Sequence, residues 1–229
     1  MTLLNSLLQE CRYALDDLNP AAYVFDDLQL TSWINQCIAE LNQFFPRRIV
    51  YTIGTTAGEH VYELEDTHLA VLQVEYPTGE EPPAYLHPLA RTDPAFWTSD
   101  DHYEFVKSRD GDSLNLPYLV ISDDPPDNET ITLDLLVEHN LLTSGSDSCT
   151  VPDRLALPII PLFVRWKAAQ ALATQESINP DILKPQVSAV EINAVRAERQ
   201  YRAALDAARK GEGDSGIASW TMDSKDRIY

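Results

Sequence analysis

Residues 26–53 read DDLQLTSWINQCIAELNQFFPRRIVYTI, and the spacing of the apolar side chains changes at Pro46. Before Pro46 they recur every three or four residues, which is the spacing of one face of an α-helix. After Pro46, isoleucine, valine, tyrosine and threonine follow one another in a strand-like pattern. Asp26 is placed to cap the helix, and Gln29 is placed to complete a capping box. We therefore expect the chain to pass from a helix into a β-rich segment at this proline.

Another amphipathic helix is expected before this stretch. Its apolar residues share helical spacing, and they are Leu3, Leu4, Leu7, Leu8, Cys11, Leu15 and Leu18. Asn19-Pro20 is expected to end this helix, because the residue before a proline is pushed out of the α region. Together the two helices predict a hairpin over residues 1–46.

Helical spacing returns after a serine-rich linker at residues 141–150. Pro158 and Pro161 disfavour the interior of a helix, since each lacks an amide donor and crowds the preceding turn. We therefore expect a short turn at residues 153–157, followed by a helix over residues 158–174.

The last expected helix follows Pro185, is rich in Ala, Arg and Glu, and ends at a glycine signal at residues 211–213. Its basic residues are Arg196, Arg199, Arg202, Arg209 and Lys210. Acidic residues are interleaved with them, namely Glu191, Glu198 and Asp206. This mixture favours a salt-bridged surface that faces solvent or another subunit over a nucleic-acid site.

The middle of the chain is β-rich. Short segments of strand-forming residues lie at residues 47–53, 60–64, 69–76, 103–107, 118–122 and 130–138. Clusters of turn residues separate them, and residues 92–101 are expected to form a short helical turn or a loop. Strands with no helix between them indicate antiparallel sheets packed as a small sandwich.

The predicted fold class is therefore α+β. A helical bundle of N- and C-terminal helices would frame an antiparallel, sandwich-like β insert, and an extended C-terminal arm would follow. The expected divisions are a helical hairpin at 1–46, the insert at 47–140, helices at 151–210 and the arm at 211–229.

The net charge of −19 is unevenly distributed. Residues 1–150 hold 26 acidic and 6 basic side chains, whereas residues 151–229 hold 10 acidic and 11 basic ones. A strongly acidic surface repels DNA phosphates, so sequence-specific DNA reading is not expected. Two interpretations of this acidic surface stay open. It serves solubility alone, or it lines a passage through which nucleic acid moves without binding.

Composition restricts the class of protein further. A hydrophobic fraction of 44% is typical of a folded protein. No apolar run is expected to reach the roughly 18–20 residues that cross a bilayer, and the first residues lack the pattern of a secretory signal. Three cysteines without paired spacing indicate neither a disulfide framework nor a zinc site. We therefore expect a soluble protein that stays in the cytoplasm.

Motifs for catalysis are missing from the sequence. The histidines lie singly, at His60, His68, His87, His102 and His139. They form no metal-binding pair or HExxH motif, and the chain has no GxSxG elbow, Walker phosphate loop or GxGxxG turn. Acidic pairs occur where helix caps and turns account for them. We therefore predict a protein that is not an enzyme and that needs no metal or cofactor.

The C-terminal arm ends in a polar, turn-rich stretch that nevertheless carries large apolar residues. These residues are Ile217, Trp220, Met222, Ile228 and Tyr229. Large aromatics are enriched where a chain anchors in the pocket of a partner, so we expect this arm to dock on another protein. The alternative is that the arm folds back on its own subunit.

Three segments carry a resemblance to a known family. Residues 25–45 contain an acidic pair followed by Leu-x-x-Trp-Ile-Asn, and residues 151–173 contain Val-Pro-Asp followed by a helix with aromatic and alanine positions. Residues 199–203 (RQYRA) fit the same pattern. This order of segments resembles the head-to-tail adaptor proteins of tailed bacteriophages, also called connector or head-completion proteins.

The resemblance implies a structural protein of the virion neck, assembled in the host cytoplasm. Such adaptors form rings, commonly of twelve copies, that bind below the portal protein. A stopper, another connector or the tail tube would be the partner on the tail side. Double-stranded DNA would pass through the lumen without specific binding, no membrane would be involved, and the C-terminal arm would contact the portal.

Two other classes of function stay open on the sequence alone. A carbohydrate- or receptor-binding β module of a virion or tail protein would bind its ligand through the insert. An enzyme would gather several of the insert's histidines with carboxylates in a deep pocket.

Overall fold

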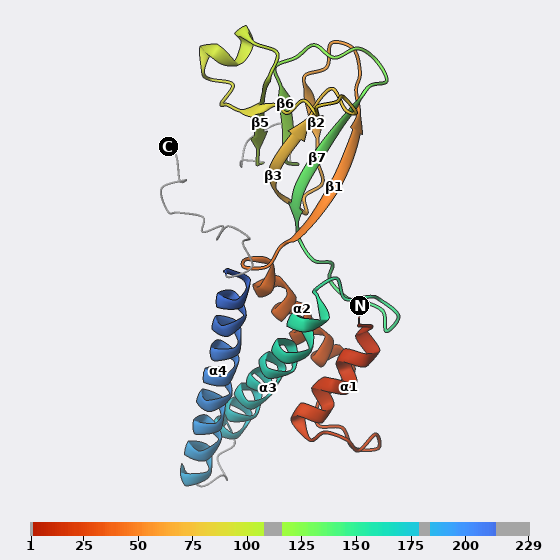
Figure 1. The fold of residues 1–229 in the computed structure, drawn as a ribbon. Coiled ribbons are helices and arrows are strands. Elements are labelled where there is room, and N and C mark those ends of the chain that lie inside the picture. Colours follow the sequence, from red (N-terminus) through yellow and green to blue (C-terminus); the bar gives the residue numbers. More distant parts are fainter. Residues whose placement is uncertain (1, 108–115, 179–183, 214–229) are drawn as a thin grey trace. The chain divides into compact units, whose positions relative to one another are not determined.

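The structure is a computed structural model that describes residues 2–107, 116–178 and 184–213. It divides into a helical unit, made of Met1–Phe44 with His139–Tyr229, and a β unit, Phe45–Glu138. Figure 1 shows helices at both ends of the chain and strands between them. The α+β fold class predicted from the sequence is confirmed.

The helical unit is built around one helix. Its elements are α1 (Leu4–Leu15), α2 (Asp27–Asn42), α3 (Asp153–Ile178) and α4 (Lys184–Gly213). α1, α2 and α4 all pack against α3. The core of this unit therefore joins segments that lie more than 100 residues apart in the sequence.

α2 begins at the Asp26 cap that the sequence predicts, but among the described residues no hydrogen bond of the Gln29 side chain completes the expected capping box. The Asp26 carboxylate accepts a hydrogen bond of 2.6 Å from the backbone N–H of Gln29, which satisfies a donor in the first turn. Phe25, just before the cap, is buried, and its ring centroid lies 5.2 Å from that of Trp33 in an edge-to-face contact. Polar capping and apolar packing therefore fix the same helix start.

α1 ends earlier than Asn19-Pro20, at Leu15. Asp16 adopts a left-handed conformation with φ of 57°, which Asp tolerates better than most residues. The chain then turns so that Asp17 is buried, and Leu18, expected on the apolar face of the helix, is exposed. The expectation for the end of this helix was therefore wrong by several residues.

A buried arginine explains this turn. The Arg12 guanidinium donates hydrogen bonds to the Asp17 carboxylate at 2.9 Å, to the Asp27 carboxylate at 2.6 Å and to the Phe25 carbonyl at 3.2 Å. Asp17 also accepts a hydrogen bond of 3.0 Å from the backbone N–H of Val24. A buried charge needs partners of this kind. The Arg12 cluster therefore ties the end of α1 to the start of α2.

α3 is one continuous helix, which corrects the expected turn at residues 153–157. Pro158 is exposed and Pro161 is half-buried. The carbonyl groups four residues before each proline belong to exposed residues, so solvent reaches the side of the helix where the amide donors are missing. The prolines therefore mark the outer side of α3 instead of interrupting it.

The segment Asp153–Gln175 is long and apolar enough to cross a membrane by length and composition. The expectation that no apolar run reaches this length was therefore wrong. The buried residues of α3 are Leu155, Ala156, Ile159, Ile160, Phe163, Val164 and Ala168. Because α3 packs against three other helices, these residues form the centre of the helical unit.

The serine-rich segment at residues 141–150 is held against the helices. The Asn35 side chain both donates to and accepts from the backbone of Leu142, at 2.8 Å in each bond. Leu3 forms a β-bridge with Ser148. These bonds fix the path of the chain into α3 and bury Leu142.

The β unit contains two sheets. Its strands are β1 (Arg47–Gly54), β2 (Val61–Glu63), β3 (His68–Glu75), β4 (His87–Pro88), β5 (His102–Val106), β6 (Tyr118–Ile121) and β7 (Thr130–Val137). One sheet has the order β1-β7-β3, and the other has the order β2-β6-β5-β4. β4, which the sequence analysis missed, pairs parallel with β5, so the expectation of antiparallel pairing alone needs this correction.

β1 and β7 pair along their whole length, from Arg47 opposite Val137 to Gly54 opposite Thr130. They are the first and last strands of the β unit. Their pairing means that the chain enters and leaves this unit at neighbouring points, as Figure 1 shows.

A shared core joins the two sheets. Leu119 and Ile121 of β6 belong to the same apolar cluster as Leu133 and Leu135 of β7, which is the packing of a sandwich. A smaller cluster on the other face of β6 contains Phe96 of the 3₁₀ turn η1 (Pro94–Thr98). All four residues of β6 are therefore buried.

The Arg12 cluster predicts a large stability effect at Asp17. In an Asp17→Ala variant the buried guanidinium loses its one buried carboxylate partner, so the free energy of unfolding should fall by about 3 kcal/mol. Urea unfolding followed by circular dichroism measures this change. Asp16→Asn is the matched control, since Asp16 is exposed and asparagine also tolerates the left-handed conformation. Equal losses in the two variants would contradict the role given to the buried pair.

Candidate assembly surface

α4 is attached to α3 by a cluster of three aromatic rings. The ring centroids of Phe163 and Trp166 lie 5.1 and 5.7 Å from that of Tyr201, and the Trp166 ring is stacked on it. Lys167 and Arg202 place their charges 4.5 and 5.6 Å from the centre of the Trp166 ring. Burial raises the pKa of Tyr201, and the nearby Cys37 and Glu40 add to this shift. This contact fixes which side of α4 faces the core.

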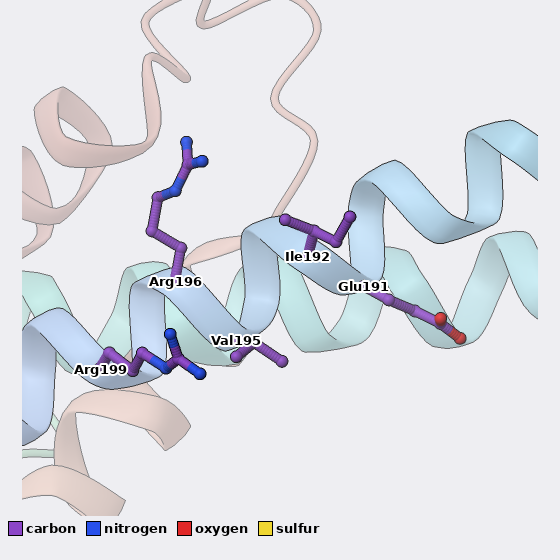
Figure 2. A pocket seen from close by; sticks show the side chains of 5 residues that line it. All are labelled: Glu191, Ile192, Val195, Arg196 and Arg199. Atoms are coloured by element: carbon purple, nitrogen blue, oxygen red, sulfur yellow. The ribbon is translucent and has the colours of Figure 1, made fainter.

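The outward side of α4 carries an apolar and arginine-rich surface, which we call the α4 face. Its residues are Glu191, Ile192, Val195, Arg196 and Arg199, which line a surface hollow of about 510 Å³. Their spacing of three, four and eight residues places them on neighbouring turns of the same helix, as Figure 2 shows. Ile192 is 56% exposed, and Val195 is similarly exposed.

The arginines of α4 differ in their contacts. Arg202 forms an ion pair of 2.9 Å with Glu40 of α2 and lies 3.8 Å from Glu198. Arg196 and Arg199 form no ion pair with any residue that the structure describes. The two arginines of the α4 face are therefore available for an external carboxylate. Apolar and arginine side chains in combination are typical of protein–protein interfaces.

The basic residues of α4 were predictable from the sequence, whereas Ile192 and Val195 were not expected to belong to a surface site. The sequence does contain a signal for Ile192 and Val195: both lie outside the helical spacing of the apolar positions that include Ala197 and Tyr201. Ala197 and Tyr201 are buried in the structure. The five predicted docking residues of the arm, Ile217, Trp220, Met222, Ile228 and Tyr229, lie outside the described residues.

The histidines are spread over both units. His68 is buried beside Tyr51, and burial lowers its pKa; His139 is buried in the helical unit, with Nδ1 3.0 Å from the Thr150 hydroxyl. In the β unit His102 lies 3.0 Å from an Asp101 carboxylate oxygen. Within residues 2–107, 116–178 and 184–213, no group of three or more His, Cys, Asp or Glu side chains is placed to hold a metal ion.

The cysteines are free and buried, including Cys149, which the sequence placed in a polar linker. Burial raises the pKa of all three thiols, and the pKa of Cys11 rises to about 12. Because the thiolate is the reactive form, these cysteines have the properties of core residues.

Thiol accessibility tests this placement. At pH 8 the native protein should show no reaction with a disulfide reagent such as DTNB within minutes, because Cys11, Cys37 and Cys149 are buried and protonated. The denatured protein should show three reactive thiols. Rapid reaction of one thiol in the native protein would contradict the described packing.

Substitutions on the two sides of α4 should have very different effects on the free energy of unfolding. Tyr201→Ala removes a fully buried ring and should lower the free energy of unfolding by about 3–5 kcal/mol. Ile192→Ser changes an exposed residue and should alter it by no more than about 0.5 kcal/mol. Thermal unfolding of dilute, unassembled protein measures both. A large loss in Ile192→Ser would show that this side of α4 is covered within the subunit.

No protein-family model matches this chain, and no curated protein matches it either. Its function is therefore inferred from its own surfaces and charges.

Proposed function

We propose that this chain is the subunit of a head-to-tail adaptor in the neck of a tailed bacteriophage. In this proposal identical subunits form a ring, commonly of twelve copies, which binds below the portal, connects the capsid to the tail and encloses the DNA channel. The single observation that carries the proposal is the α4 face: exposed Ile192 and Val195 lie beside two arginines that form no ion pair with a described residue, on a helix whose other side is packed against α3. A subunit that contacts identical neighbours needs such a surface.

The distribution of charge supports the same function. Residues 45–138, the β unit, hold 19 acidic and 5 basic side chains, a net charge of −14. An acidic lining would let DNA move through a channel by repulsion, because phosphates find no basic partners on it. Solubility alone accounts for the same charge, so the acidic surface supports the proposal without carrying it.

The order of segments gives further support. The helices that carry the family resemblance, α2, the start of α3 and α4, are in one packed unit, and the β unit is inserted between them. In the proposal the helical unit forms the frame of the ring. The arm beyond Gly213 would dock on the portal through Ile217, Trp220, Met222, Ile228 and Tyr229.

Assembly on a portal tests this function. The full chain, mixed with the portal protein of the same phage genome, should co-purify with it and appear in negative stain as an added ring around the channel. A chain truncated after residue 213 should lose binding to the portal. If the full chain neither joins the portal nor forms a ring, the adaptor function is wrong; if the truncated chain joins as well as the full chain, the docking role of the arm is wrong.

One observation favours the second candidate, a carbohydrate- or receptor-binding β module. Trp97 of η1 is 54% exposed, and its ring centroid lies 5.7 Å from that of His60 in an edge-to-face contact. An exposed tryptophan with a fixed orientation can stack on an apolar ligand face. Binding of the full chain to a glycan array, lost in Trp97→Ala, would favour this function over the adaptor.

A further inference from the structure

A second apolar surface lies at the end of the α1–α2 hairpin, and we call it the hairpin face. It consists of the exposed apolar residues between the middle of α1 and the first turn of α2. These residues are Tyr13, Leu18, Tyr23, Val24 and Leu28. Leu28 is 83% exposed, the highest value among the exposed large apolar residues of the described chain. Exposed apolar residues gathered in one short stretch of chain are a feature of interaction surfaces.

The Arg12 cluster holds the hairpin face in place. The Arg12 guanidinium lies 3.4 Å from the centre of the Tyr23 ring, and Asp17 accepts a hydrogen bond from the backbone N–H of Val24. Leu28 follows in the first turn of α2, which Asp26 caps. A preorganised surface loses less conformational entropy when it binds, so this arrangement favours binding.

The hairpin face is acidic. Residues 1–44 contain six acidic side chains and a single basic one, Arg12, which is buried. Glu10, Asp16 and Asp26 are exposed in or next to the same stretch of chain. No exposed basic side chain of the α1–α2 hairpin can therefore pair with them.

The two faces complement each other in chemistry. The α4 face offers Arg196 and Arg199 beside exposed Ile192 and Val195, and the hairpin face offers exposed carboxylates beside leucine, valine and tyrosine. An interface with an apolar centre and complementary charges at its edge has the composition of a specific contact.

The two faces lie on different helices of the same unit. α1 and α4 each pack against α3, and Figure 1 shows them on opposite sides of it. A face that binds a different face on the next copy makes a heterologous contact, and repeated heterologous contacts close into a ring or continue as a filament. The arrangement of the helical unit is therefore suited to cyclic assembly.

We propose that the α4 face of one subunit docks on the hairpin face of the next subunit. This inference rests on the proposed adaptor function and assigns the subunit contact of its ring. The occupant of each face is a second copy of this chain.

Site-directed cross-linking tests this contact. Two single variants, Leu28→Cys and Val195→Cys, are mixed, assembled with the portal and treated with a short bis-maleimide; the native cysteines are buried and should not compete. A covalent dimer should form in the mixture and in neither variant alone. The double variant, which carries both Leu28→Cys and Val195→Cys in one chain, should give a ladder of higher multimers. Leu141→Cys mixed with Val195→Cys is the matched control, since Leu141 is exposed in the same helical unit but outside the hairpin face, and it should give no dimer.

Each other outcome overturns a defined part of the account. Rings seen by negative stain without the Leu28–Val195 product would refute the contact and leave the adaptor function standing. Absence of assembly with the portal would refute the adaptor function itself. A product within one chain between Val195→Cys and Trp220→Cys would show that the arm covers the α4 face, which also refutes the contact.

Charge reversal provides a second test. Arg196→Glu with Arg199→Glu should raise the protein concentration needed for assembly at least 10-fold, and added salt should weaken assembly of the unaltered chain, since the contact includes complementary charges. Lys210→Glu is the matched control on the same helix and should assemble like the unaltered chain. Equal assembly of all three proteins would contradict a role for the arginines.

Discussion

The pairing of β1 with β7 is the constraint on which the rest of this structure depends. The helical unit is made of two pieces of chain that 94 residues separate, and its core forms only if those pieces meet. β1 and β7 pair antiparallel, with Arg47 opposite Val137 at one end and Gly54 opposite Thr130 at the other. This pairing brings the two ends of the intervening segment together. The backbone N–H of His139 then donates a hydrogen bond of 2.8 Å to the Asn42 side chain, so the helical unit resumes where α2 ended. The antiparallel ladder thereby offsets the entropic cost of closing a long loop.

Once the chain returns, α3 supplies the apolar surface against which the other helices pack. α1 and α2 pack against α3 while the Arg12 cluster ties these two helices to each other, and the stacked rings of Trp166 and Tyr201 join α4 to α3. These buried contacts leave Leu28 and Ile192 exposed on the outside. The packing of the core therefore determines which residues of α2 and α4 are exposed on the surfaces proposed for assembly.

Local signals made part of this fold predictable. Asp26 and Gln29 marked the start of α2 because a cap acts over four residues, and alternation marked the longer strands because it reflects one buried face. Pro158 misled the expectation for α3, since a proline on the outer side of a helix has a smaller effect than one inside it. β4 has only two residues, and a pairing that short leaves no pattern in the sequence.

The candidate site was harder to predict, because its properties depend on contacts between residues that are far apart in the sequence. Three features of the site depend on tertiary packing. Arg12 is buried, Leu28 is exposed, and Arg196 and Arg199 form no ion pair within the part of the chain that the structure describes. The sequence identified the arginines of α4 by type and spacing, but whether they pair depends on where α2 places Glu40. The predicted docking residues of the arm, such as Trp220, stay a prediction because they lie outside the described residues.

The number of copies bound to one portal tests the central claim most directly. Native mass spectrometry of the portal complex should show an added mass that is a whole multiple of 25.7 kDa and that corresponds to one closed ring, commonly of twelve subunits. A cyclic contact between identical subunits predicts complete rings with few partial ones. A single bound chain, or no added mass at any concentration, would contradict the account.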